Sequence, residues 1–135
     1  MISLGDNYQT NFSFTQDQVN AFAELTGDTN PIHIDKEFAS KTPFKKPIMH
    51  GFLSASIFSR VLGTEFPGNG SVYLSQTMNF LRPMFVDEEY QATFTVTDID
   101  SKRKTAIIKT EILALSNKKI TVKGEAKLMH KTLID

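Results

Sequence analysis

The sequence predicts an α+β fold, in which one antiparallel sheet packs around a long apolar helix. The first half of the chain has helical periodicity, whereas the second half alternates apolar and polar residues as strands do. Between the halves, residues 48–63 read IMHGFLSASIFSRVLG, which is apolar on every side and carries one formal charge, Arg60. A helix of that kind is buried, and a sheet with one apolar face must be covered. We therefore expect the helix at the centre and the sheet curled around it.

The segment before this helix is predicted to hold one strand and two shorter helices. Residues 8–14 alternate as a strand does. Thr15 and Gln18 then form a capping box: the Thr15 hydroxyl accepts from the backbone N–H of Gln18, and the Gln18 side chain reaches back. Gly27 is expected to end the first helix in the left-handed conformation. A turn over residues 28–35 and a short helix over residues 35–40 follow.

The second half is predicted to form four antiparallel strands, at residues 71–81, 90–99, 104–115 and 119–129. The last strand shows the alternation best, with Lys123, Glu125, Lys127 and Thr121 facing solvent and the residues between them facing the core. The chain has 135 residues, so we expect one domain that spans residues 1–135.

Composition excludes several classes of function. The 15 basic and 15 acidic residues cancel, which argues against nucleic acid or an anionic membrane as the main partner. The chain has no Cys, so disulfides, thiolate metal sites and Cys nucleophiles are excluded. The first ten residues have neither a basic start nor an apolar run, as a signal peptide would, and no apolar stretch is long enough to span a membrane. We expect a soluble, cytoplasmic protein.

One turn carries the groups that acid–base chemistry needs. Asp28 and His33 stand on either side of Asn30-Pro31, and a rigid turn can bring a carboxylate and an imidazole to one point. One such group takes a proton while the other gives one, and each contributes typically ~10²–10⁴-fold to a rate. The residues alone leave a second interpretation open, in which Asp28 and Asn30 only shape the turn and the His33 ring bonds to backbone.

The segment from Phe22 to Ala39 resembles the hydratase 2 motif of the MaoC-like family. The matching positions are Phe22, Thr26, Gly27, Asp28, Asn30, Pro31, Ile32, His33 and Ala39. The resemblance extends over nearly the whole chain, and within the family it is to short, single-domain (R)-specific enoyl-CoA hydratases. It implies a hot dog fold and the reversible hydration of a trans-2-enoyl thioester, with no cofactor beyond the coenzyme A that is part of the substrate.

The resemblance also implies roles for individual residues. Asp28 and His33 would hold one water for the reaction, and Asn30 would orient the pair. Gly51, at the start of the central helix, would present its backbone N–H to the thioester oxygen, and Ser59 matches a family position near the pair. Further candidates for substrate binding, each with an equally simple packing or surface explanation, are His50, Phe52, Leu62, Lys45 and Arg82, with Lys46 beside them.

No metal site is predicted, because the three His show no metal-ligand spacing. Two alternatives from other classes remain: an acyl thioesterase on the same fold, and an acyl-thioester binding subunit without catalysis. The partner that the resemblance implies is an acyl-CoA or an acyl-carrier-protein thioester. A homodimer is expected because a single curled sheet leaves an unpaired edge.

Overall fold

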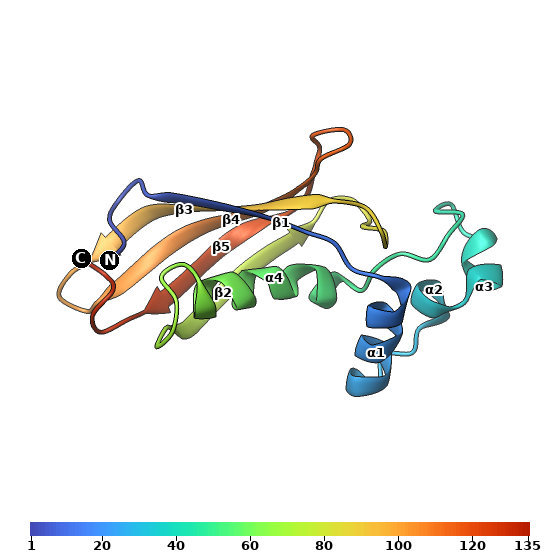
Figure 1. Cartoon of the computed structure of the whole chain (residues 1–135), viewed down its shortest axis with the longest axis horizontal. Coiled ribbons are helices and arrows are strands. Elements are labelled where there is room, and N and C mark those ends of the chain that lie inside the picture. The colour runs from blue at the N-terminus through green and yellow to red at the C-terminus, as the bar shows by residue number, and fades with distance from the viewer.

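The computed structural model describes residues 1–135 as a curved five-stranded sheet with one long helix lying along its concave face (Figure 1). The strand order is β1-β3-β4-β5-β2, and every neighbouring pair is antiparallel. The elements are β1 (Asn7–Phe12), α1 (Gln16–Thr26), α2 (Pro31–Ile34), α3 (Lys36–Ser40), α4 (Gly51–Thr64), β2 (Val72–Phe80), β3 (Tyr90–Asp100), β4 (Thr105–Ala114) and β5 (Ile120–Met129). No helix is long and apolar enough to cross a membrane.

The local signals around α1 are confirmed. Thr15 and Gln18 form both bonds of the capping box, and Gly27 ends α1 with φ of 79°. The prediction of a plain turn over residues 28–35 was wrong in part, because Pro31–Ile34 forms one turn of helix, α2. Asn30 caps it with its side chain and Pro31 occupies the first position, where a missing N–H costs nothing.

The central helix begins at Gly51, as the resemblance implied, and not at residue 48, where the apolar segment starts. Residues 48–50, which precede α4, are extended. The Ile48 N–H donates to the Ile32 carbonyl at 3.1 Å and the Met49 N–H to the Met84 carbonyl at 2.7 Å. These long-range bonds hold the segment straight, so the helix can only start after it.

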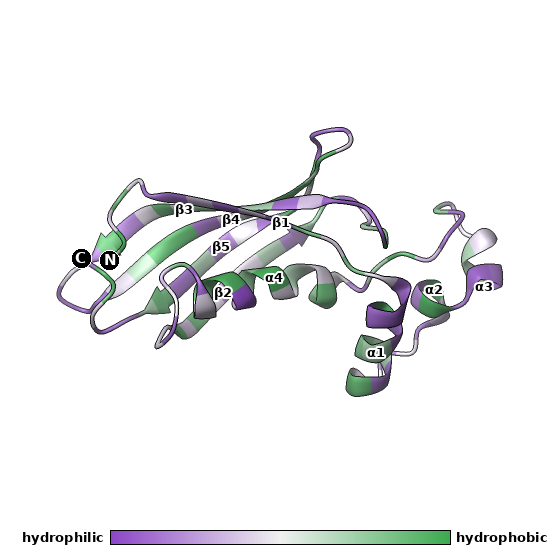
Figure 2. Ribbon diagram, viewed as in Figure 1, coloured by the Kyte–Doolittle hydropathy of each residue, from purple (hydrophilic) through white to green (hydrophobic).

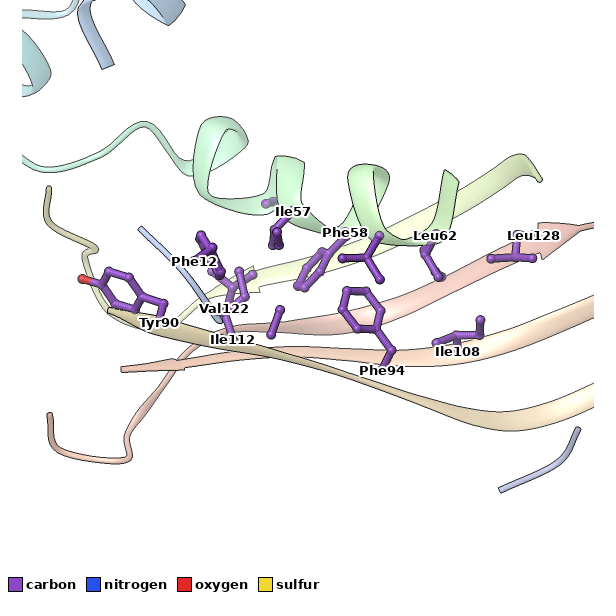
Figure 3. Packing of buried hydrophobic residues seen from close by; sticks show 14 of the residues in the cluster. Phe12, Ile57, Phe58, Leu62, Tyr90, Phe94, Ile108, Ile112, Val122 and Leu128 are labelled. Atoms are coloured by element: carbon purple, nitrogen blue, oxygen red, sulfur yellow. The ribbon is translucent and has the colours of Figure 1, made fainter. Parts of the chain in front are cut away.

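One face of α4 forms the core with the sheet. Ile57, Phe58 and Leu62 point toward Phe94 and Ile112 on the strands (Figure 3). Hydrophobic residues run along α4 and the strands beside it (Figure 2). The expectation of a fully enclosed helix was wrong for the single chain, because the face away from the sheet is open and carries Phe52 with 70% of its surface exposed. The sheet of one chain covers only one side of the helix (Figure 1).

The two edges of the sheet differ in character. β1 is polar, whereas β2 leaves Val72, Tyr73, Leu74 and Phe80 exposed. β2 also lies close to its neighbour at Gly124 of β5, where an added Cβ would be 1.7 Å from the Thr77 carbonyl oxygen. A glycine in a strand often marks such a close approach of backbone. Thr121, predicted to face solvent, is buried instead and donates to the Ile112 carbonyl.

Candidate active site

The loop between α1 and α2 places Asp28 and His33 side by side. Gly27 turns the chain at the end of α1, which leaves Asp28 exposed on the loop, and α2 carries His33 half-buried. Asn30 connects the two, because its backbone N–H donates to the Asp28 carboxylate at 3.4 Å and its side-chain oxygen accepts from the Ile32 N–H at 3.2 Å. Asn30 therefore shapes the turn that carries both groups.

His33 is arranged as a neutral base. Its Nδ1 lies 2.7 Å from the Ile48 carbonyl oxygen, which can only accept, so Nδ1 carries the hydrogen and Nε2 has a free lone pair. Burial is the main influence on the ring and lowers the pKa of His33 below its ordinary value of 6.5. The Ile48 carbonyl and Asp28 each raise that pKa, and His50 lowers it. Because the net direction is downward, the ring is neutral at pH 7 and can take a proton.

The structure adds a third group to this pair. His50 is only 2% exposed, and its ring centroid lies 4.0 Å from that of His33. One donor atom each of Asp28, His33 and His50 lies within 4.8 Å of the others, an arrangement that could also hold a metal ion. Sequence spacing did not reveal it, because His50 comes from a separate segment beyond α3. The expectation that the chain needs no metal stays a prediction.

A cavity of about 600 Å³ opens beside these residues. His33 and Gly51 form part of its wall, and the other lining residues are Phe44, Ile48, Met49, Phe52, Ser54, Phe80, Leu81, Arg82, Pro83, Met84 and Val122. Gly51 is the first residue of α4, so its N–H has no acceptor within the helix. The Phe80 ring packs directly over it, since a Cβ on Gly51 would lie 2.9 Å from that ring. The cavity is thus mainly apolar, with a base and a free N–H in its wall.

The remaining predicted residues separate into two groups. Phe52 and Arg82 line the cavity. Ser59 and Leu62 do not, because Ser59 lies two turns further along α4 beside Tyr73 and Leu62 belongs to the core. Lys45 lies outside the cavity, in the loop between α3 and α4. Sequence reasoning missed the wall formed by Phe44, Phe80 and Leu81; no local pattern marks it, since these residues converge from two distant segments.

Comparison with known proteins agrees with this fold. The model of the MaoC like domain matches residues 3–118, so the chain belongs to the MaoC-like family. It is 39% identical to an (R)-specific enoyl-CoA hydratase of Aeromonas caviae over 93% of this chain and 92% of that protein. It is 36% identical to an (R)-specific enoyl-CoA hydratase of Rhodospirillum rubrum over 87% of this chain and 80% of that protein.

A solved structure shares the architecture. The (R)-hydratase from A. caviae involved in PHA biosynthesis superposes with a TM-score of 0.92 at 38% identity, over 96% of this chain and 98% of that one. The hot dog fold predicted from the sequence is therefore confirmed.

Proposed function

We propose that this chain is an (R)-specific enoyl-CoA hydratase, which adds water reversibly to trans-2-enoyl-CoA to form (R)-3-hydroxyacyl-CoA. The observation that carries the proposal is that Asp28 lies beside His33, and that His33, with its Nε2 free, shares the wall of an apolar cavity with the unpaired N–H of Gly51. The names of the two relatives above support the same reaction.

The proposed reaction uses one water held between the two side chains. Its oxygen bonds to C3 of the enoyl group while His33 Nε2 takes one of its protons, and the electrons of the C2–C3 double bond move toward the thioester oxygen. The Asp28–His33 pair then returns a proton to C2 on the same face, which restores the thioester. Water is thereby added across the double bond and both side chains return to their starting state.

The backbone N–H of Gly51 stabilises the negative charge that develops on the thioester oxygen. This N–H points from the N-terminus of a 14-residue helix, where the helix dipole favours negative charge. A preorganised donor of this kind stabilises the transition state more than the substrate. The absence of a side chain lets Phe80 and the thioester approach the same N–H.

The test that separates this reaction from thioester hydrolysis uses crotonyl-CoA. Hydration removes the enoyl absorbance and releases no free thiol, and chiral analysis of the product is expected to give the (R)-3-hydroxyacyl thioester. Release of free coenzyme A with crotonate as the other product would assign the chain to the thioesterases instead. Binding of longer acyl thioesters without turnover would assign it to the non-catalytic binding subunits.

The proposed assembly is a homodimer built on β2. This strand is an edge with free backbone groups, and its exposed apolar residues continue onto Phe52 of α4. A second copy would cover both, and it would border the cavity because Phe52 and Phe80 belong to its wall. Light scattering at micromolar concentration is expected to give twice the monomer mass, and Leu74→Lys is expected to lower it; a monomeric wild type would refute the dimer.

The proposed carrier is coenzyme A, which has phosphate groups that need cations. Arg82 stands between the cavity and a smaller hollow of about 190 Å³, which Lys46 and Lys119 also line. The one carboxylate there, Glu88, already accepts hydrogen bonds from Tyr90 and Ser116. Lys46 lies 4.3 Å over the Phe85 ring, which holds its ammonium group at the hollow.

A further inference from the structure

His50 makes a set of contacts that neither helix capping nor substrate contact explains. It occupies the N-cap position of α4, yet its side chain makes no capping hydrogen bond. It is almost fully buried and does not line the cavity. Its Nε2 lies 3.0 Å from the Asp28 carbonyl oxygen, and its ring lies between those of Phe22, with centroids 4.8 Å apart, and His33.

We propose that His50 is a positioning residue of the Asp28–His33 pair: its Nε2–H holds the backbone of Asp28, and its ring face holds the ring of His33. The proposal rests on the hydratase function above. His50 also directly precedes Gly51 and bonds through its carbonyl to Ser54. One residue therefore joins the three groups that the reaction uses, Asp28 and His33 through its side chain and Gly51 through its backbone.

The partner of His50 shows which ring nitrogen donates. A carbonyl oxygen can only accept, so Nε2 carries a hydrogen. The other ring nitrogen, Nδ1, is buried with no hydrogen-bond partner. A buried unpaired polar atom is unfavourable, and an aromatic hydrocarbon side chain would fill the space without it. The advantage of a histidine at this position is therefore the hydrogen bond from its Nε2 to the Asp28 carbonyl.

The positioning has a mechanical and an electrostatic part. Asp28 is exposed on a loop, and misplacement of a reacting group by about 1 Å can cost on the order of 10²-fold in rate. His50 also lowers the pKa of His33, which keeps the His33 ring in the neutral form that can take a proton from water. The titratable groups that face His33 are Asp28 and His50.

Two substitutions separate the two contacts. His50→Gln keeps an N–H donor for the Asp28 carbonyl and loses the ring, whereas His50→Phe keeps the ring and loses the donor. Each is expected to lower kcat on crotonyl-CoA by roughly tenfold with KM changed little, and His50→Ala, which loses both contacts, by on the order of 10²-fold. Because His50 lowers the pKa of His33, the acid limb of kcat is expected to move to higher pH in the Phe variant.

The matched control is His130→Gln. His130 is also a buried histidine whose Nε2 bonds to a carbonyl, that of Asn69 at 2.7 Å, but it lies beyond the other end of α4. This variant is expected to unfold at lower temperature while kcat and the acid limb stay unchanged. Folded His50 variants with the wild-type kcat would overturn the proposal, as would an equal loss of kcat in His130→Gln.

NMR titration of His33 in wild type and His50→Phe makes the result independent of turnover. A higher midpoint in the variant supports the contact between the rings, and an unchanged midpoint contradicts it. If the midpoint is higher in His50→Phe but the wild-type protein does not hydrate crotonyl-CoA, the proposed function is contradicted. The positioning of His33 by His50 then still stands.

Discussion

Replacing Gly124 with Ala tests how closely β2 is held against the sheet. The added Cβ would lie 1.7 Å from the Thr77 carbonyl oxygen and 2.6 Å from its carbon, whereas real Cβ contacts stay beyond 3.0 Å. Both atoms are backbone, so no side chain can rotate away and β2 has to retreat by more than about 1 Å. Overpacking of this kind costs typically ~1–3 kcal/mol, and a backbone shift in a strand puts the loss near the upper end. For a chain of this size about 3 kcal/mol corresponds to a fall in Tm of about 10 °C.

The assay is thermal unfolding followed by circular dichroism, with Gly63→Ala as the matched control. A Cβ at Gly63 of α4 meets no atom within 4 Å, so the same substitution there is expected to raise stability by about 0.5–1 kcal/mol. Since β2 also carries Phe80 of the cavity wall, Gly124→Ala is expected to raise KM for crotonyl-CoA. A Gly124→Ala protein with the wild-type Tm would refute the reasoning.

Three further predictions concern the site. The acid limb of kcat/KM is expected to have its midpoint below pH 6.5, because the pKa of His33 is lowered, and a midpoint above pH 6.5 would contradict this. The stability that neutral His33 contributes is full above pH 6.5 and is lost as the pH falls toward the pKa of His33 in the folded protein. Lys46→Met is expected to lower kcat/KM several-fold on crotonyl-CoA but not on crotonyl-pantetheine, which lacks the phosphates. Lys102→Met, in the turn between β3 and β4, is the control. Equal losses on both substrates would argue against the phosphate contact. Dialysis against EDTA is expected to leave the rate unchanged; a loss restored by Zn²⁺ would assign Asp28, His33 and His50 to a metal.

The strands could be predicted because their determinants are local. The alternation of apolar and polar residues predicted the ends of β2 to β5 to within one residue. The capping box and Gly27 predicted where α1 begins and ends. The apolar pattern alone starts α4 too early, at residue 48, because bonds to Ile32 and Met84 from distant segments keep residues 48 and 49 extended. The start at Gly51 came from the family resemblance. The open face of α4 was missed for a similar reason: its composition indicates burial, but the sheet of one chain covers only one side.

The same division applies to the site. Asp28 and His33 lie in one turn, so a local motif brings them together in the sequence as well as in space. His50 and Phe80 reach the site through the packing of α4 and β2, and nothing in their neighbouring residues indicates a contact with His33 or Gly51. Ser59, which the family pattern placed near the pair, lies beside Tyr73 in this chain.

The central claim is that Asp28 and His33 act together on one water. The most direct test follows the enoyl absorbance of crotonyl-CoA with wild type, Asp28→Asn, His33→Gln and the double variant, after circular dichroism has shown that all four are folded. Each single substitution is expected to lower kcat by ~10²–10⁴-fold, and the double variant is expected to lose little more than either single one, because the pair acts as a unit. Wild-type turnover that survives either substitution would contradict the claim.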